Sequence, residues 1–129
     1  MRASPDTCIA TPGGEIAIAD LRVGDLVYSD HHGTIVVPLV AVARTPVTAH
    51  HVMRVITDAG HVFEVSGPHP TADARRLDGL VAGADLDGDR VVSIERIAYT
   101  HPFTHDILPA SASGTYLANG VWLGSTLLR

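Results

Sequence analysis

Short apolar segments rich in Val, Ile and Thr, separated by turns rich in Gly, Pro, Asp and Asn, dominate this 129-residue chain. Segments of this length and composition are typical of β-strands, and only residues 71–80 carry a weak helix pattern. Many short strands with regular turns predict an all-β, barrel-like or sandwich-like fold. Pro38 inside one long segment indicates a sheet edge or a bulge. The expected strands are 8–11, 15–19, 26–29, 35–43, 51–56, 61–65, 91–99, 105–108 and 115–123.

Length and composition exclude several classes of protein. The length suits one domain, which would bury roughly 65–70% of the surface of its unfolded chain. Cys8 is the only cysteine, which excludes an internal disulfide and zinc sites that need two or more Cys ligands. A net charge of -5 argues against a nucleic-acid partner. No apolar run reaches the about 20 residues of a membrane span, and no signal peptide is visible, so we expect a soluble, cytoplasmic domain without a membrane partner.

A faint internal repeat runs through the sequence. The segment 19–27, Ala-Asp-Leu-Arg-Val-Gly-Asp-Leu-Val, is echoed by Ala-Asp-Leu-Asp-Gly-Asp-Arg-Val at 84–91. Two β subdomains of similar topology would explain this echo. Chance similarity between two Gly-Asp turns is the alternative.

Histidine is frequent, with eight copies, and two adjacent pairs suggest metal ligands. The pairs are His31-His32 and His50-His51. Neighbouring residues on a strand point to opposite faces, so neither pair could bind one ion from a strand. We therefore interpret these histidines as solvated turn residues and expect neither a metal nor a cofactor.

The sequence Ser66-Gly-Pro-His69 places a hydroxyl and an imidazole three residues apart at the end of an expected strand. Such a pair can converge on one carbonyl or amide group, and histidine is suited to protonating an amide leaving group near neutral pH. A turn capped by Ser and His is the alternative. Further along, a carboxylate at Asp106 could orient a nearby imidazole, with His105 beside it.

Taken in order, these segments resemble the Hint (Hedgehog/intein) autoprocessing domain of bacterial inteins. Residues 11–27 look like the block that follows the family's nucleophile, and residues 60–70 look like its Thr-x-x-His block, with Ser66 for Thr. Residues 104–108 and 115–123 look like its last two blocks. The resemblance covers nearly the whole chain and implies a pseudo-twofold, horseshoe-shaped β fold, which would also account for the repeat. Residues 1–129 would form one Hint domain, with 1–7 as the N-terminal junction segment.

The resemblance also implies a mechanism. In the family, a Cys or Ser at the first position attacks the preceding carbonyl and forms a thioester, while the second-block hydroxyl and histidine strain and protonate the amide nitrogen. Here Ser66 and His69 would take these roles, Asp106 would support polarisation or positioning, and His105 is the next candidate. The partner would be the chain's own flanking polypeptide, with water or a small nucleophile as acyl acceptor, and the domain is expected to be a monomer.

Both ends of the chain depart from the family pattern. The family's terminal His-Asn pair falls on Gly124 and Ser125, so Asn-driven C-terminal cleavage and complete splicing are expected to be absent. At the start, the strand register puts the nucleophile on Arg2 or Ala3 and places Cys8 inside the strand. A lone strand cysteine is typical of a small core residue, and we interpret Cys8 as structural, with Cys8 as nucleophile the alternative.

The leading hypothesis is a single-turnover, self-processing Hint domain cut from a larger bacterial-type protein. It would carry out an N–S acyl shift at its own N-terminal junction, followed by thioester hydrolysis or transfer. With Arg2 at the nucleophile position, this chain would be inactive at the first step, through design or natural loss. The alternative is a catalytically inactive Hint fold that serves as an interaction or linker module, so the sequence leaves open whether the chain is an enzyme.

Overall fold

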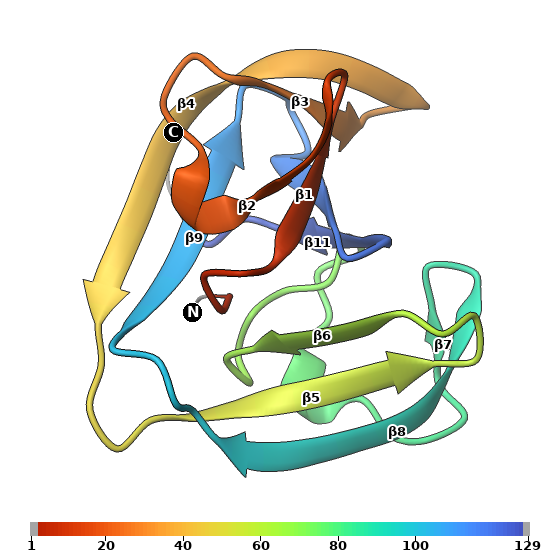
Figure 1. The fold of residues 1–129 in the computed structure, drawn as a ribbon. Coiled ribbons are helices and arrows are strands. Elements are labelled where there is room, and N and C mark those ends of the chain that lie inside the picture. Colours follow the sequence, from red (N-terminus) through yellow and green to blue (C-terminus); the bar gives the residue numbers. More distant parts are fainter. Residues whose placement is uncertain (1–2, 128–129) are drawn as a thin grey trace.

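The computed structural model describes residues 3–127 and confirms the all-β prediction. Over those residues, eleven strands and two short 3₁₀ helices make up the regular structure (Figure 1). The strands are β1 (Cys8–Thr11), β2 (Gly14–Ala17), β3 (Leu26–Asp30), β4 (Thr34–Pro46), β5 (His51–Thr57), β6 (Val62–Val65), β7 (Asp85–Leu86), β8 (Asp89–Ala98), β9 (Phe103–Pro109), β10 (Thr115–Ala118) and β11 (Val121–Gly124). The 3₁₀ helices are η1 (Ile18–Asp20) and η2 (Leu77–Gly79).

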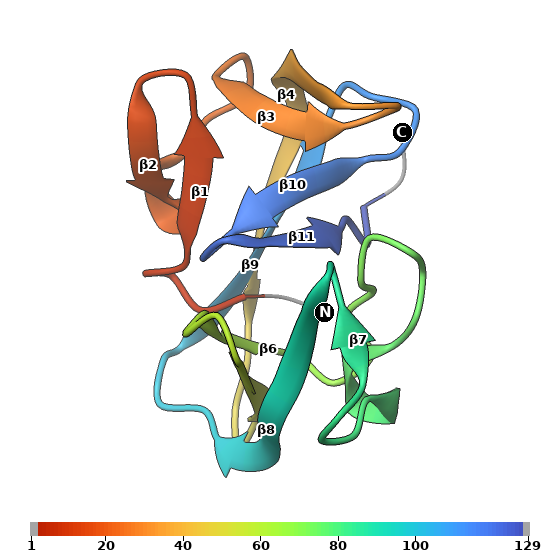
Figure 2. The same cartoon turned by 90° about the vertical axis from the view of Figure 1, so that its right-hand side faces the viewer.

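The strands form three sheets, with the orders β11-β10-β1-β2, β3-β4-β9 and β6-β5-β8-β7. The 13-residue strand β4 pairs antiparallel with β3 over its first part and with β9 over its second. A bulge between Leu39 and Ala41 marks the change of partner, which confirms the expected irregularity beside Pro38. Figures 1 and 2 show the sheet of β5 to β8 in the lower half of the molecule and the other strands above it.

A 3₁₀ turn and a glycine begin the first half of the horseshoe. After η1, Gly24 has a φ of 94°, in the left-handed region that favours glycine. Its N–H donates to the Leu39 carbonyl at 2.9 Å, and the Leu39 N–H donates to the Asp25 carbonyl at 2.9 Å. These two bonds join the start of β3 to the middle of β4.

The second half repeats this pattern bond for bond. After η2, Gly83 has a φ of 92°. Its N–H donates to the Val91 carbonyl at 2.8 Å, and the Val91 N–H donates to the Ala84 carbonyl at 2.9 Å. The identical pair of bonds joins the residue before β7 to β8, which confirms the expected pseudo-twofold fold.

The register of the repeat differs from the one that the sequence suggested. Residues 18–25 correspond in structure to 77–84, rather than to the Gly-Asp echo at 84–91. The echo misleads because Asp87 and Gly88, with φ of 56° and 84°, form the tight hairpin turn between β7 and β8. A polar turn dipeptide recurs wherever a hairpin needs it, so it is a weaker sign of homology between halves than the buried 3₁₀ turn.

The weak helix prediction for 71–80 is wrong, because most of this segment is a series of turns that ends in η2. The Thr71 hydroxyl donates to Asp73 and accepts the Arg75 N–H at 2.9 Å. Such local side-chain bonds compete with a helical backbone. Ala74 has a φ of 68°, which also interrupts a helix.

One cluster of buried side chains fills the space between the sheets. It includes Ile9, Val27, Leu39, Val55, Phe63, Leu77, Leu86, Ile107, Tyr116 and Leu123. Ala3 belongs to the same cluster and is fully buried. The described part of the N-terminal segment is therefore packed into the core.

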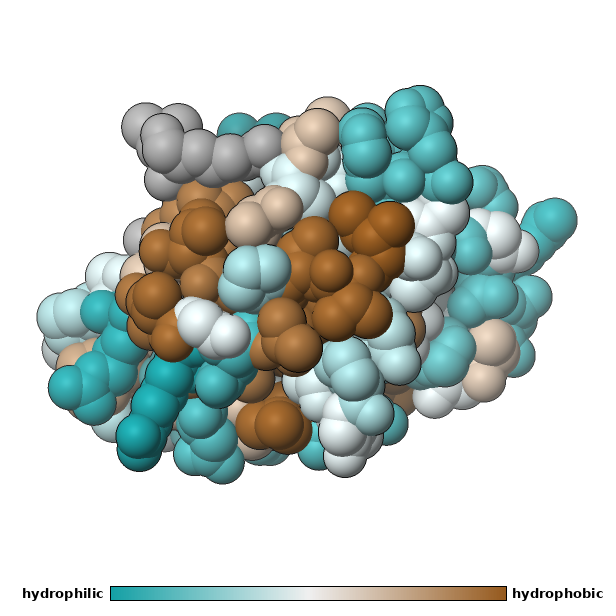
Figure 3. Space-filling model, turned by 90° about the horizontal axis from the view of Figure 1, so that it is seen from above, coloured by the Kyte–Doolittle hydropathy of each residue, from teal (hydrophilic) through white to brown (hydrophobic). Residues whose placement is uncertain are grey.

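Strands β3 and β4 also carry apolar side chains on their outer face. The exposed ones are Leu26, Val36, Val40 and Val42. Figure 3 shows apolar surface gathered on the top of the molecule, where Figure 1 places these strands. No helix within residues 3–127 is long and apolar enough to cross a membrane.

Candidate active site

The N-terminal segment lies between the two halves of the fold (Figure 2). The Ala3 N–H donates to the His105 carbonyl at 2.6 Å, and the His105 N–H returns a bond of 2.8 Å to the Ala3 carbonyl. Ala3 also forms an antiparallel bridge with Val65 at the end of β6. Because the pairing is antiparallel, the residues that follow Val65 and His105 lie next to the position that precedes Ala3 in the chain. Ser66 and Asp106 are those residues, so both face the direction from which the chain arrives.

His69 is fully buried in the turn after β6. Its backbone N–H donates to the Ser66 carbonyl at 3.0 Å, and its carbonyl accepts the Leu77 N–H at 3.1 Å. The ring meets the Tyr116 ring edge-on, with 6.3 Å between centroids. Its Nε2 atom lies 3.1 Å from the Tyr116 hydroxyl oxygen. The imidazole is therefore fixed in position by the backbone and by a partner from β10.

The Asp106 carboxylate accepts hydrogen bonds on both of its oxygens. The Tyr116 hydroxyl and the Ile107 N–H each donate to Oδ1 at 2.8 Å. On Oδ2, the Thr126 N–H donates at 2.8 Å and the Thr126 hydroxyl at 2.5 Å. Asp106 thus ties β9, β10 and the segment after β11 together. Sequence reasoning did not identify Tyr116 or Thr126.

These bonds decide which nitrogen of His69 carries a proton. The single hydroxyl proton of Tyr116 goes to Asp106, so the Tyr116 oxygen must accept from His69 Nε2–H. The remaining nitrogen, Nδ1, is therefore the one that can gain and lose a proton. The chain His69–Tyr116–Asp106, which we call the buried relay, makes His69 suited to proton transfer through Nδ1.

Ser66 is buried at the end of β6, and its hydroxyl oxygen lies 2.9 Å from Nε2 of His50. Sequence reasoning treated His50 as a solvated turn residue, and the structure brings it into the site instead. Its ring meets Tyr99 edge-on, with 5.8 Å between centroids. Partial burial lowers the pKa of His50, with a further contribution from His51.

His105 contributes to the site chiefly through its backbone, which holds Ala3. Burial lowers the pKa of its imidazole, and the charges of Arg44 and His101 lower it further. The His105 ring borders a cavity of about 270 Å³ that Asp106 also lines. His105 is therefore close to the junction, without a side-chain bond that assigns it a role.

Solved inteins have the same architecture. The chain matches the gp41-1 intein with a TM-score of 0.77 at 20% sequence identity, over 95% of this chain and 97% of that one. It matches a DnaB intein from Synechocystis sp. PCC 6803 with a TM-score of 0.83 at 18% identity, over 98% and 99%. For the MchDnaB-1 intein the TM-score is 0.78 at 21% identity, over 96% and 99%.

This chain has the Hint fold. The match confirms the fold that its sequence blocks predicted. No protein-family model matches the sequence, and no curated protein matches it. With identities near one fifth, the likeness establishes the architecture, and the chemistry must be argued from the residues of this Hint fold.

The structure places Cys8 at the start of β1, as the sequence predicted, and away from the bonds of the buried relay. Its backbone N–H donates to Asn119 Oδ1 at 2.7 Å, and its thiol lies 3.6 Å from the Asp6 carbonyl oxygen. These contacts hold the β10–β11 turn against the N-terminal segment of the Hint fold. Arg2, the expected nucleophile position, lies outside the described residues.

At the other end of the Hint fold, a neighbouring segment crowds Gly124. A Cβ atom there would lie 3.2 Å from the Thr71 carbonyl oxygen and 3.3 Å from Pro70 Cγ. Both distances are shorter than an ordinary van der Waals contact. The position where the resemblance places a terminal histidine therefore has little room for any side chain.

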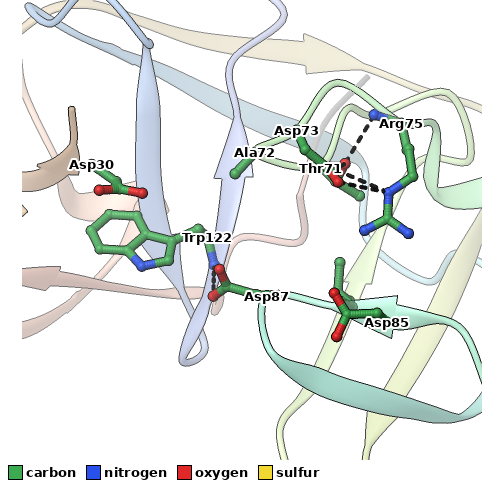
Figure 4. A pocket seen from close by; sticks show the side chains of 9 residues that line it. Asp30, Thr71, Ala72, Asp73, Arg75, Asp85, Asp87 and Trp122 are labelled. Carbon is green, nitrogen blue, oxygen red and sulfur yellow. Dashed lines mark hydrogen bonds and ion pairs between the residues drawn. The ribbon is translucent and has the colours of Figure 1, made fainter. Parts of the chain in front are cut away.

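An acidic pocket of about 300 Å³ lies elsewhere on the Hint fold (Figure 4). Its lining includes Asp30, Asp73, Asp85, Asp87 and Trp122, and it shares no residue with the site at Ala3. Burial raises the pKa of Asp87, and the three nearby carboxylates of Asp30, Asp89 and Asp85 add to this. Across residues 3–127, no group of three or more His, Cys, Asp or Glu side chains is arranged to hold a metal ion.

Proposed function

We propose that this Hint domain is built to act on its own N-terminal peptide junction, by an N–S acyl shift followed by hydrolysis or transfer of the thioester, and that with Arg2 at the nucleophile position the chain stops before the first step. The observation that carries the proposal is the pairing of Ala3 with both His105 and Val65. It holds the junction segment between the strand that precedes Ser66 and the strand that contains Asp106. A substrate covalently attached to the domain needs no separate binding pocket.

Position 2, His69 and Ser66 have different roles in the proposed reaction. The step needs a thiol at position 2, which an Arg2→Cys substitution would supply. That thiol gives up its proton and forms a C–S bond to the preceding carbonyl carbon, and the C–N bond of the junction amide breaks. The amide nitrogen leaves as an amine, and the buried relay favours His69 Nδ1 as the atom that delivers its proton. Ser66 interacts with the same amide group. Water or a small nucleophile then takes the acyl group and returns the thiol.

The proposal includes no C-terminal cleavage by asparagine cyclisation. Ser125 has no carboxamide, and Gly124 has no imidazole. The close contacts of Gly124 with Pro70 and Thr71 support this, because a histidine there would require the neighbouring backbone to move. We therefore expect Gly124→His with Ser125→Asn to leave the C-terminal junction intact.

The test is to replace Arg2 with Cys behind a reporter protein and to add dithiothreitol to the folded chain. Reporter release is expected, and His69→Ala should abolish it. His31→Ala, which removes a histidine from an exposed turn, is the matched control and should release the reporter normally. No release from the folded Arg2→Cys chain would contradict the proposal.

The alternative function, an inactive Hint fold that serves as an interaction or linker module, is favoured by the arginine at position 2 and by the crowding at Gly124. It predicts that His69→Ala changes only stability, even after a cysteine is placed at position 2. The reporter assay therefore separates the two candidates.

A further inference from the structure

His50 is fixed in place before it contacts Ser66. Strand β4 ends at Pro46, and Ala49, with a φ of 49°, turns the chain into β5. The His50 carbonyl accepts the Tyr99 N–H at 2.9 Å, and the two rings meet edge-on. Both the backbone and the ring of His50 therefore have defined positions. The contact with Ser66 is part of that arrangement and does not come from a mobile surface side chain.

The two members of the pair differ in their access to solvent. Ser66 is 2% exposed, whereas His50 is partly exposed and borders a cavity of about 400 Å³. The titratable or charged groups around His50 are the N-terminal amino group, His51 on β5, Asp78 on η2, Arg96 on β8, and Tyr99. Protons can therefore reach His50 from solvent, while the hydroxyl that it contacts stays buried beside the junction segment.

The protonation of His50 limits what the Ser66 hydroxyl can do. A hydroxyl has one proton to donate, and its oxygen can also accept. When His50 is positively charged, Nε2 can only donate to Ser66 Oγ, and the Ser66 proton must go to another acceptor. When His50 is neutral, Nε2 can accept that proton, and Ser66 Oγ can then act only as an acceptor towards other groups.

We propose that His50 is a positioning residue that sets the direction of the Ser66 hydroxyl proton and so makes the junction reaction depend on pH. This inference rests on the proposed function. With His50 charged, Ser66 donates to the carbonyl oxygen of the junction amide and stabilises the negative charge that develops there as the C–S bond forms. With His50 neutral, the tautomer with a bare Nε2 accepts the Ser66 proton, so this donation is weakened and the step slows.

The test compares His50→Lys with the parent in the Arg2→Cys reporter chain, as a ratio of release rates at each pH. Lysine can only donate, so it holds Ser66 in the arrangement that charged His50 imposes. Burial lowers the pKa of His50, so the parent is mostly neutral there at pH 7.5. We expect a ratio near one at low pH that rises to about fivefold by pH 7.5, the effect of one hydrogen bond.

His51→Lys is the matched control, because it adds the same charge at the neighbouring, exposed position. Its ratio should not change with pH. A pH-independent ratio for His50→Lys in an active chain would overturn this inference alone. No release from the Arg2→Cys parent would overturn the proposed function, and this inference with it.

A second measurement does not depend on cleavage. The titration of His50 can be followed by NMR in the chain as it stands and in Ser66→Ala. Loss of the Ser66 partner should move the His50 titration midpoint. A His50 midpoint that is the same in both chains would overturn the inference.

Discussion

Two polar networks adjoin the residues that pair with Ala3, and they differ in how freely protons can reach them. The buried relay of His69, Tyr116 and Asp106 is enclosed by the core, and its donors and acceptors are matched. The pair of Ser66 and His50 has one buried member and one that is partly exposed and borders a cavity of about 400 Å³. The buried relay therefore holds His69 in one tautomer, whereas the hydrogen bond between His50 and Ser66 can change with pH.

The largest expected effect comes from breaking the relay at its carboxylate. Asp106→Ala leaves the buried donors of Tyr116 and Ile107 without their acceptor, so we expect the free energy of unfolding to fall by about 3–4 kcal/mol. Urea unfolding measures it. Asp20→Ala, at an exposed carboxylate, is the control and should change little. A loss below about 1 kcal/mol would show that the relay is not enclosed.

Removing one oxygen from the relay should have a smaller effect. Tyr116→Phe keeps the buried ring but removes the hydroxyl that joins His69 to Asp106, so we expect a loss of about 1–2 kcal/mol in stability. In the Arg2→Cys chain it should also slow thiol-dependent release about tenfold, because the His69 tautomer is no longer fixed. Tyr28→Phe, on the half-exposed ring of β3, is the matched control. Unchanged release with Tyr116→Phe would mean that the relay has no part in proton transfer.

A substitution at Thr126, which bonds Asp106 at the end of the buried relay, should reduce stability still less. Thr126→Val keeps the backbone N–H bond to Asp106 and removes only the hydroxyl bond. We expect a loss of about 1 kcal/mol in urea unfolding. The same substitution at Thr34, which is exposed at the start of β4, provides the comparison. A loss as large as that of Asp106→Ala would place Thr126 inside the enclosed part of the network.

The smallest effect is expected at the solvent-facing pair, as a slope of stability with pH. Burial lowers the pKa of His50 in the folded state below its ordinary value of 6.5. As the pH falls, the unfolded chain therefore binds a proton at His50 before the folded chain does. The contribution of neutral His50 to the free energy of unfolding is complete above pH 6.5 and is lost as the pH falls towards the folded-state pKa. Urea unfolding between pH 7.5 and 5 should show a smaller decrease for His50→Gln than for the parent. An identical slope for His50→Gln and the parent would contradict the assignment.

Much of the fold could be predicted because its signals are local. The hairpin between β5 and β6 follows from the turn at 57–60, where the Gly60 N–H donates to Thr57 and Gly60 has a φ of 85°. The repeat was found, but its register was wrong, because buried apolar residues in a 3₁₀ turn carry less visible sequence signal than a Gly-Asp pair. The helix prediction for 71–80 was wrong because the Thr71 hydroxyl forms hydrogen bonds with the Asp73 side chain and the Arg75 N–H, which compete with a helical backbone.

The candidate site could be predicted only in part. Ser66, His69 and Asp106 stand in recognisable blocks. Ser66 and Asp106 directly follow residues that pair with Ala3, and Tyr116 joins His69 to Asp106. Their partners escaped sequence reasoning because the bonds join distant residues. Tyr116 is 47 positions from His69, and His50 is 16 positions from Ser66. No local sequence feature marks the contact of Tyr116 with His69. The predicted hairpin of 51–56 and 61–65 brings His50 near Ser66, and only the direction of the His50 side chain required the structure.

The sequence by itself determined the strands, the turns and the order of the blocks, because hydrophobic spacing and turn chemistry act over a few residues. It also determined that Gly124 and Ser125 directly follow the last block. Only the tertiary structure decided which nitrogen of His69 is tied to Tyr116 and which histidine faces Ser66. These choices depend on tertiary contacts. His69 follows β6 and Tyr116 lies on β10 in a different sheet, while His50 and Ser66 meet beside the paired strands β5 and β6, where hydrogen-bond donors and acceptors must match within a few ångströms.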